Sequence, residues 1–149
     1  NIVVINPNMT AAMTARIAAT AKVVAQPGTN IIAIQPGAGP ASIEGYADEA
    51  MAVPHMLEAL FAAQTSHAAS TGGVAGYVIA CFDDTGLDAA RCILDAPVVG
   101  IGEAACYMAS LLQRRYHPQS LDQPDRAQPG QVRLGLTLRA GAGSRSGGA

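Results

Sequence analysis

The sequence is poor in the residues that surfaces for nucleic acids and anionic membranes use. Tryptophan is absent, aromatic residues make up 4% of the 149 residues, and charged residues make up 13%. Stacking on bases needs aromatic rings, and attraction to phosphate needs a positive charge. The formal net charge is −2, so we expect neither nucleic acid nor a membrane as a partner.

Cysteine is scarce as well. The three residues Cys81, Cys92 and Cys106 are too few for a disulfide framework, and their odd number leaves at least one thiol free. The simplest interpretation is a reducing, cytoplasmic setting. The three histidines are scattered, and no Cys/His spacing is that of a zinc site, so no metal is expected.

Long hydrophobic runs and the common motifs for cofactors are also missing. Residues 59–82 carry no charge, but polar residues and glycines interrupt them, so no spanning helix is expected. The segment 37–42 lacks the third glycine of a dinucleotide fingerprint and contains Pro40, so no cofactor is expected. The chain opens at Asn1 inside an expected strand, which suggests that a few residues precede it.

What the sequence does contain is the alternation of an α/β protein. Half of the residues are hydrophobic and the mean hydropathy is +0.23, which supports a core. Short apolar runs predict strands, and segments with helical spacing predict helices between them. The strands are expected at 2–5, 30–34, 77–80 and 97–101, and the helices at 9–24, 48–64 with a kink or restart at Pro54, 87–94 and 102–114. This order predicts an open parallel sheet flanked by helices, with ligands bound beyond the carboxyl ends of the strands.

The composition changes after residue 114. Residues 1–114 hold nine acidic and four basic residues, whereas residues 115–149 hold two acidic and five basic residues, all of them arginine. The second segment lacks isoleucine and methionine and ends in a run of glycine, alanine, serine and arginine. We therefore expect one α/β domain over 1–114 and a poorly ordered, irregular tail over 115–149.

Cys81 is the most informative single residue, because it ends a predicted buried strand. It stands just before an expected helix whose first turn holds Asp83, Asp84 and Thr85. Amide groups at a helix start stabilise a thiolate, whereas nearby carboxylates oppose one unless they act as caps. A buried structural cysteine and a functional thiol are about equally supported here. Cys92 and Cys106 are expected to be small core residues.

The loops after the first and second strands supply the other candidates. Asn8 is expected to cap the helix that begins near Met9. Asn6 has no evident capping role, so its amide either contacts a substrate or stabilises the turn. In the second loop, Ser42 and its neighbours either contact a ligand or cap the following helix.

Taken together, four blocks of this sequence resemble the Asp/Glu/hydantoin racemase superfamily, and in particular its hydantoin and allantoin racemase branch. The blocks are Val4 to Asn8 with Met13-Thr14, Gly39 to Gly45 with Asp48 to Ala50, Ala80 to Arg91, and Pro97 to Ala105. They occur in the order typical of the family and cover residues 1 to about 114. The resemblance implies one half of a two-lobed fold, whose active site lies between the lobes.

The resemblance also implies a cofactor-independent racemase. Each half of the family fold supplies one cysteine, and Cys81 matches the catalytic cysteine of the first half. It would move the proton at the stereocentre of a 5-substituted hydantoin or allantoin, a small-molecule substrate. The residues that match the substrate-binding positions are Asn6, Asn8, Ser42, Ile43, Phe82 and Asp83, the last two through their backbone amides.

The family's second cysteine lies in a Gly-Cys loop, and no such motif follows Arg114. We interpret the tail as a shifted reading frame and expect slow, one-sided proton exchange at best. Two alternatives stay open. One is an inactive α/β half that binds ligand or dimerises, with formation of a homo-oligomer left open. The other is a single-cysteine decarboxylase or cis-trans isomerase.

Overall fold

Four strands and four helices alternate along the part of the chain that the structure describes, as the sequence predicts. The computed structural model describes residues 1–68 and 72–112, so the predicted tail over 115–149 lies outside the described residues. The elements are β1 (Ile2–Ile5), α1 (Ala11–Val24), β2 (Ile31–Ile34), α2 (Tyr46–His67), β3 (Gly76–Ile79), α3 (Leu87–Ile93), β4 (Val98–Gly100) and α4 (Ile101–Leu112). Within the described residues, no helix is long and apolar enough to cross a membrane.

The strands form one parallel sheet in the order β2-β1-β3-β4. At its carboxyl edge, Ile5 of β1 is level with Ile34 of β2 and with Ile79 of β3. The residues that follow these strands therefore leave the sheet side by side. This confirms the predicted open parallel α/β sheet.

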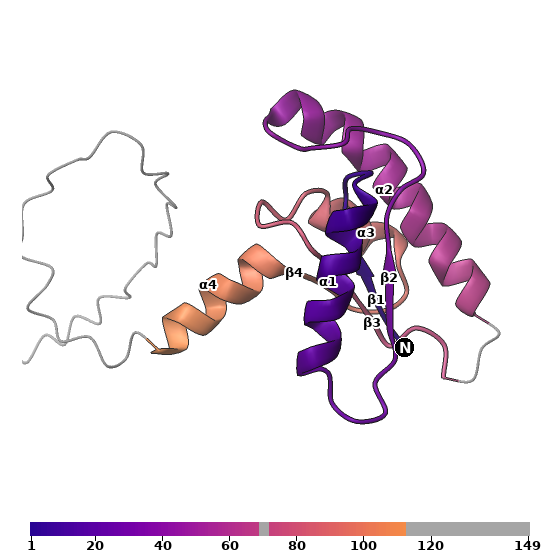
Figure 1. Cartoon of the computed structure of the whole chain (residues 1–149), viewed down its shortest axis with the longest axis vertical. Coiled ribbons are helices and arrows are strands. Elements are labelled where there is room, and N and C mark those ends of the chain that lie inside the picture. Colours follow the sequence, from indigo (N-terminus) through magenta and orange to yellow (C-terminus); the bar gives the residue numbers. More distant parts are fainter. Residues whose placement is uncertain (69–71, 113–149) are drawn as a thin grey trace, which may run out of the picture. The chain divides into compact units, whose positions relative to one another are not determined.

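The two faces of the sheet are covered unequally (Figure 1). Helices α2 and α3 contribute Met56, Leu60 and Ala90 to a core against one face, together with Tyr77 and Ile79 of the sheet. All five side chains are buried. On the other face, helix α1 contacts β2 and β1, and Thr14 is its one buried residue.

One predicted helix boundary is wrong, and of the kink or restart predicted at Pro54 the restart does not occur, each for a local reason. Helix α1 begins at Ala11 rather than near Met9, because the Asn8 side chain holds the backbone of Thr10 in a turn. Helix α2 runs through Pro54 without restarting. Proline removes one amide donor, but Pro54 lies on the exposed side while Ala52 and Met56 pack into the core and hold the helix together.

The expectation that Cys92 and Cys106 are core residues is also wrong. Both are exposed free thiols. Cys92 lies on the outer side of α3, whose core-facing residues are Leu87 and Ala90. Cys106 lies on α4, where Gly102 is the one buried residue.

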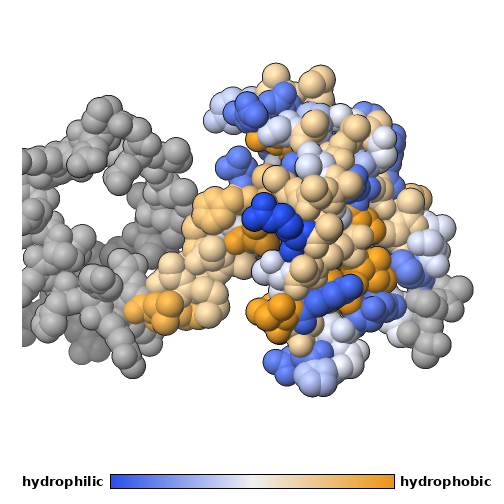
Figure 2. All heavy atoms as spheres, in the orientation of Figure 1, coloured by the Kyte–Doolittle hydropathy of each residue, from blue (hydrophilic) through white to orange (hydrophobic). Residues whose placement is uncertain are grey.

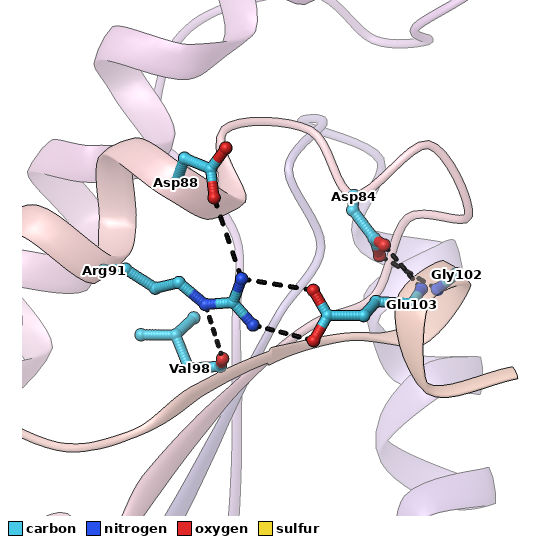
Figure 3. A network of polar contacts seen from close by, with 6 residues as sticks. All are labelled: Asp84, Asp88, Arg91, Val98, Gly102 and Glu103. Atoms are coloured by element: carbon cyan, nitrogen blue, oxygen red, sulfur yellow. Dashed lines mark hydrogen bonds and ion pairs between the residues drawn. The ribbon is translucent and has the colours of Figure 1, made fainter. Parts of the chain in front are cut away.

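A single carboxylate joins the loop after β3 to the start of α4 (Figure 3). Asp84 has a left-handed backbone with φ +51°, a conformation that aspartate tolerates better than most residues. Its side-chain oxygens accept hydrogen bonds from the amides of Gly102 at 2.9 Å and Glu103 at 2.6 Å. The carboxylate thus satisfies amides at a helix start that have no partner within the helix.

An ion pair reinforces the same junction. The guanidinium of Arg91, on α3, donates to both carboxylate oxygens of Glu103 at 3.1 and 2.9 Å and through Nε to the carbonyl of Val98 at 3.2 Å. Hydrogen bonding to Arg91 lowers the pKa of the Glu103 carboxyl. Helix α3, strand β4 and helix α4 are therefore held to one another by polar contacts.

The loop after β3 packs closely against the backbone of Gly102, which predicts that Gly102→Ala destabilises the protein. Helix propensity alone favours alanine by about 1 kcal/mol, but a Cβ at Gly102 would overlap the carbonyl oxygen of Phe82. We expect a net loss of about 1–3 kcal/mol in the free energy of unfolding, as for other overpacked sites. Urea unfolding measures it, with Gly37→Ala as the control because that position is open. A stabilised Gly102→Ala variant would contradict the packing.

Candidate active site

A cavity of about 250 Å³ opens at the carboxyl edge of the sheet. The loop after β1, the loop after β2 and the end of β3 all contribute to it. It is lined by Asn6, Pro7, Asn8, Met13, Ser42, Ile43, Ala80, Cys81 and Phe82. Six of the seven residues singled out from the sequence thus lie together, although they come from three separate segments.

The Asn6 side chain makes hydrogen bonds within the protein, as the turn-stabilising alternative of the sequence analysis expects. It is 1% exposed, and its Nδ2 donates to Asn8 Oδ1 at 2.8 Å and to Thr14 Oγ1 at 3.1 Å. Its Oδ1 accepts from the amide of Asn8 at 3.3 Å. Asn6 therefore joins the end of β1 to helix α1 and fixes the position of Asn8.

Asn8 keeps a donor for the cavity. Its Oδ1 accepts from the amide of Thr10 at 2.9 Å, so this oxygen organises the turn into α1. Its Nδ2 reaches the sulfur of Met13 at 3.5 Å. A thioether is a weak acceptor, so this amide group can turn to a better acceptor at small cost.

The loop after β2 is tied to the loop after β1. The amide of Met9 donates to the carbonyl of Pro40 at 3.1 Å, and the Thr10 hydroxyl donates to the carbonyl of Ala41 at 2.6 Å. These bonds bring the exposed Ser42 and the half-buried Ile43 to the cavity. Gly45 is the N-cap of α2 and has no side-chain cap, so the capping role considered for Ser42 is not used.

The environment of Cys81 differs from the one expected. Helix α3 begins at Leu87, so Cys81 does not stand directly before a helix start. The half-buried thiol instead accepts a hydrogen bond from the hydroxyl of Thr85, with 3.4 Å between Oγ1 and Sγ. Thr85 is fully buried, which keeps its hydroxyl away from water and aimed at the sulfur.

The two carboxylates near Cys81 lie away from the thiol. Asp84 points to the start of α4, where both of its oxygens accept amide hydrogen bonds. Asp83 is exposed and lines a separate hollow together with Glu49, Asp88 and Glu103 rather than the cavity. The Asp84 carboxylate thus acts as a helix cap. In the sequence analysis, capping is the role in which a nearby carboxylate does not oppose a thiolate at Cys81.

Thr85 is the residue at this site that sequence reasoning missed. Thr85 follows Cys81 by four residues. This spacing brings its hydroxyl to the sulfur only with a particular turn between the two residues, which the sequence alone does not give. That turn is set by the left-handed backbone of Asp84 and by the bond from the Asp84 amide to the Cys81 carbonyl at 3.1 Å. The signal in the sequence is the Asp-Asp-Thr-Gly segment, which is rich in turn-forming residues.

A comparison with known protein families identifies the family of this chain. A profile of the family described as Asp/Glu/Hydantoin racemase matches residues 2–117. The chain belongs to the Asp/Glu/hydantoin racemase family. The predicted resemblance is thereby confirmed.

Curated relatives include two hydantoin racemases. This racemase-family chain is 46% identical to the hydantoin racemase of Pseudomonas sp. (strain NS671) over 115 residues, which are 77% of the chain and 44% of that protein. It is 47% identical to the hydantoin racemase of Rhizobium meliloti over 116 residues, 78% of the chain and 46% of that protein. The chain thus spans less than half the length of these relatives.

Solved structures of similar proteins show the same fold. The allantoin racemase from Klebsiella pneumoniae is 50% identical with a TM-score of 0.68, over 74% of this chain and 42% of that one. The allantoin racemase from Pseudomonas fluorescens is 31% identical with a TM-score of 0.65, over 74% of this chain and 44% of that one. The predicted fold class, one half of an Asp/Glu racemase-like fold, is therefore confirmed.

The hydrogen bond to Cys81 predicts that Thr85→Val slows alkylation of this thiol. Valine keeps the shape but removes the donor, and losing a hydrogen bond of about 1 kcal/mol that orients the sulfur corresponds to about fivefold in rate. Iodoacetamide labelling resolved by peptide mass spectrometry measures each cysteine separately. Cys92 and Cys106 should keep their rates, and Thr85→Ser should restore that of Cys81. Equal Cys81 rates in all three proteins would contradict the assignment.

Proposed function

We propose that this chain carries the first half of the active site of a cofactor-independent racemase acting on a 5-substituted hydantoin or on allantoin. The observation that supports it most directly is the placement of Cys81 beside Asn8, Ser42 and Ile43 in one cavity. The relatives named above as hydantoin and allantoin racemases support the substrate class. A small heterocycle suits a cavity of about 250 Å³.

In this proposal Cys81 is the acid and base for one face of the substrate. Its thiolate takes the proton from the stereocentre, and the electron pair of that C–H bond passes into the neighbouring carbonyl to give an enolate. The thiol then returns a proton to the same carbon. A thiol suits both directions because its ordinary pKa lies near physiological pH.

The enolate oxygen needs donors that are already in place. The Nδ2 of Asn8 is one, because its present partner is the weak acceptor Met13. The backbone amide of Phe82 is a second candidate, because Phe82 lines the cavity next to Cys81. Asn6 acts indirectly, because its side chain fixes the position of Asn8. Ser42 and Ile43 shape the part of the pocket that receives the substituent of the ring.

The opposite face of the substrate needs another acid. Cys92 and Cys106 do not line the cavity, and they lie on α3 and α4. We therefore propose that this chain by itself exchanges the proton with solvent on one face and does not racemise efficiently. The product of this half-reaction keeps its configuration.

Solvent deuterium tests the proposal. In D₂O, one enantiomer of a 5-substituted hydantoin should take up deuterium in the presence of the protein faster than without it, as followed by proton NMR. Optical rotation should change much more slowly than deuterium enters. Cys81→Ala should return the uptake to the rate without protein, and Cys92→Ala should leave it unchanged.

Three results would contradict the proposal. Uptake by Cys81→Ala at the rate of the unaltered chain would remove Cys81 from the reaction. No uptake from either enantiomer of a hydantoin or allantoin would exclude activity of this half. Loss of optical rotation in step with uptake would show that a second proton donor works on the other face.

A further inference from the structure

A large hollow of the described structure lies on a face of the sheet and not at the strand ends. It has a volume of about 670 Å³. Val4, Val78 and Ala80 form its floor, α1 supplies Ile17 and Ala21 as a wall, and Ile101 marks the start of α4. We call it the α1 groove. Arg16 is the one charged residue among those that line it.

Helix α4 carries an apolar stripe that matches such a groove. Ile101, Ala105, Met108 and Leu112 recur at helical spacing and therefore lie on one face. Ile101 is 38%, Met108 58% and Leu112 70% exposed. The orange tones of Figure 2 show the hydrophobic character of the α4 surface. Among the described elements, α4 packs mainly against β4.

The groove and the stripe are complementary in chemistry and size. The stripe has no charge, so docking it would bury apolar surface without stripping water from an ionised group on the helix. The 12 residues of α4 extend for about 18 Å, close to the roughly 21 Å of the 14-residue α1 that forms the wall. A parallel sheet is ordinarily covered on both faces, and a helix is the element that covers it.

Helix α4 is held away from the groove of its own chain. It begins at Ile101, directly after β4 ends at Gly100, with no residue between them to form a turn. The Asp84 carboxylate and the Arg91–Glu103 ion pair fix the first turn of α4. Folding α4 back over its own sheet would break these contacts, whereas a second chain can offer its α4 without breaking them.

We propose that two copies of this chain associate by reciprocal exchange, with α4 of each copy seated in the α1 groove of the other. The arrangement is two-fold symmetric, so both stripes and both grooves are covered and the assembly closes as a dimer. It requires no contribution from Cys81 or the cavity at the strand ends. The proposal is therefore independent of the proposed function.

Disulfide trapping in the full chain tests the exchange. In a background in which the three natural cysteines are serine, Ile17→Cys is combined with Met108→Cys, which pairs the groove wall with the stripe. Mild oxidation should give a covalent dimer that reductant converts to monomer. Ile17→Cys combined with Ser110→Cys is the matched control, because Ser110 lies on the opposite side of α4, and it should give at least fivefold less dimer.

The other outcomes of the trapping experiment overturn the proposal. An internal disulfide within one chain would show that α4 closes on its own groove. A ladder of higher oligomers would show an open head-to-tail assembly, and no disulfide at all would show that the stripe and groove do not meet.

Light scattering on the chain with its natural cysteines gives an independent measurement. The mass should be twice 15.1 kDa, and Met108→Glu should weaken the dimer at least tenfold, whereas Ser110→Glu should leave it intact. Both side chains are exposed in the single chain, so neither change disturbs its core. A monomer at all concentrations, or equal dimers of both variants, would contradict the exchange.

Discussion

The parallel register of β1 with its two neighbours is the constraint on which the rest of the structure depends. Because Ile5 is level with Ile34 and Ile79, three loops leave the sheet at one edge and form one cavity. A shift of one residue in either pairing would also turn the core side chains of that strand to the opposite face. The same register that buries the core thus brings Asn8 and Cys81 together.

Asp84 links this cavity to the start of α4. Its left-handed backbone closes the turn after Cys81 and places Thr85 at the sulfur, while its carboxylate caps α4. One residue therefore determines the surroundings of the thiol and the direction in which α4 leaves the sheet. From the sequence alone, the negative charge of Asp84 is unfavourable for a thiolate. In the structure, this carboxylate accepts hydrogen bonds from the amides of Gly102 and Glu103.

The sequence predicts the strands, their parallel arrangement and the loops that line the cavity, because apolar runs and turn residues are local signals. It does not predict side-chain contacts that depend on the exact path of the chain between the two residues. Asn6 donates to Thr14 on α1, and Thr85 reaches Cys81 through a turn that Asp84 sets. The exposure of Cys106 on α4 was missed because an apolar helix pattern shows which face is apolar and not whether anything covers it.

The central claim is that a hydantoin or allantoin ring binds at the strand ends beside Cys81, and its most direct test uses the three free cysteines together. Alkylation is followed at each cysteine by peptide mass spectrometry, with and without saturating substrate. The account predicts that the substrate slows labelling of Cys81 and leaves that of the exposed Cys92 and Cys106 unchanged. Labelling of Cys81 at the same rate with and without every hydantoin and allantoin tested would contradict it.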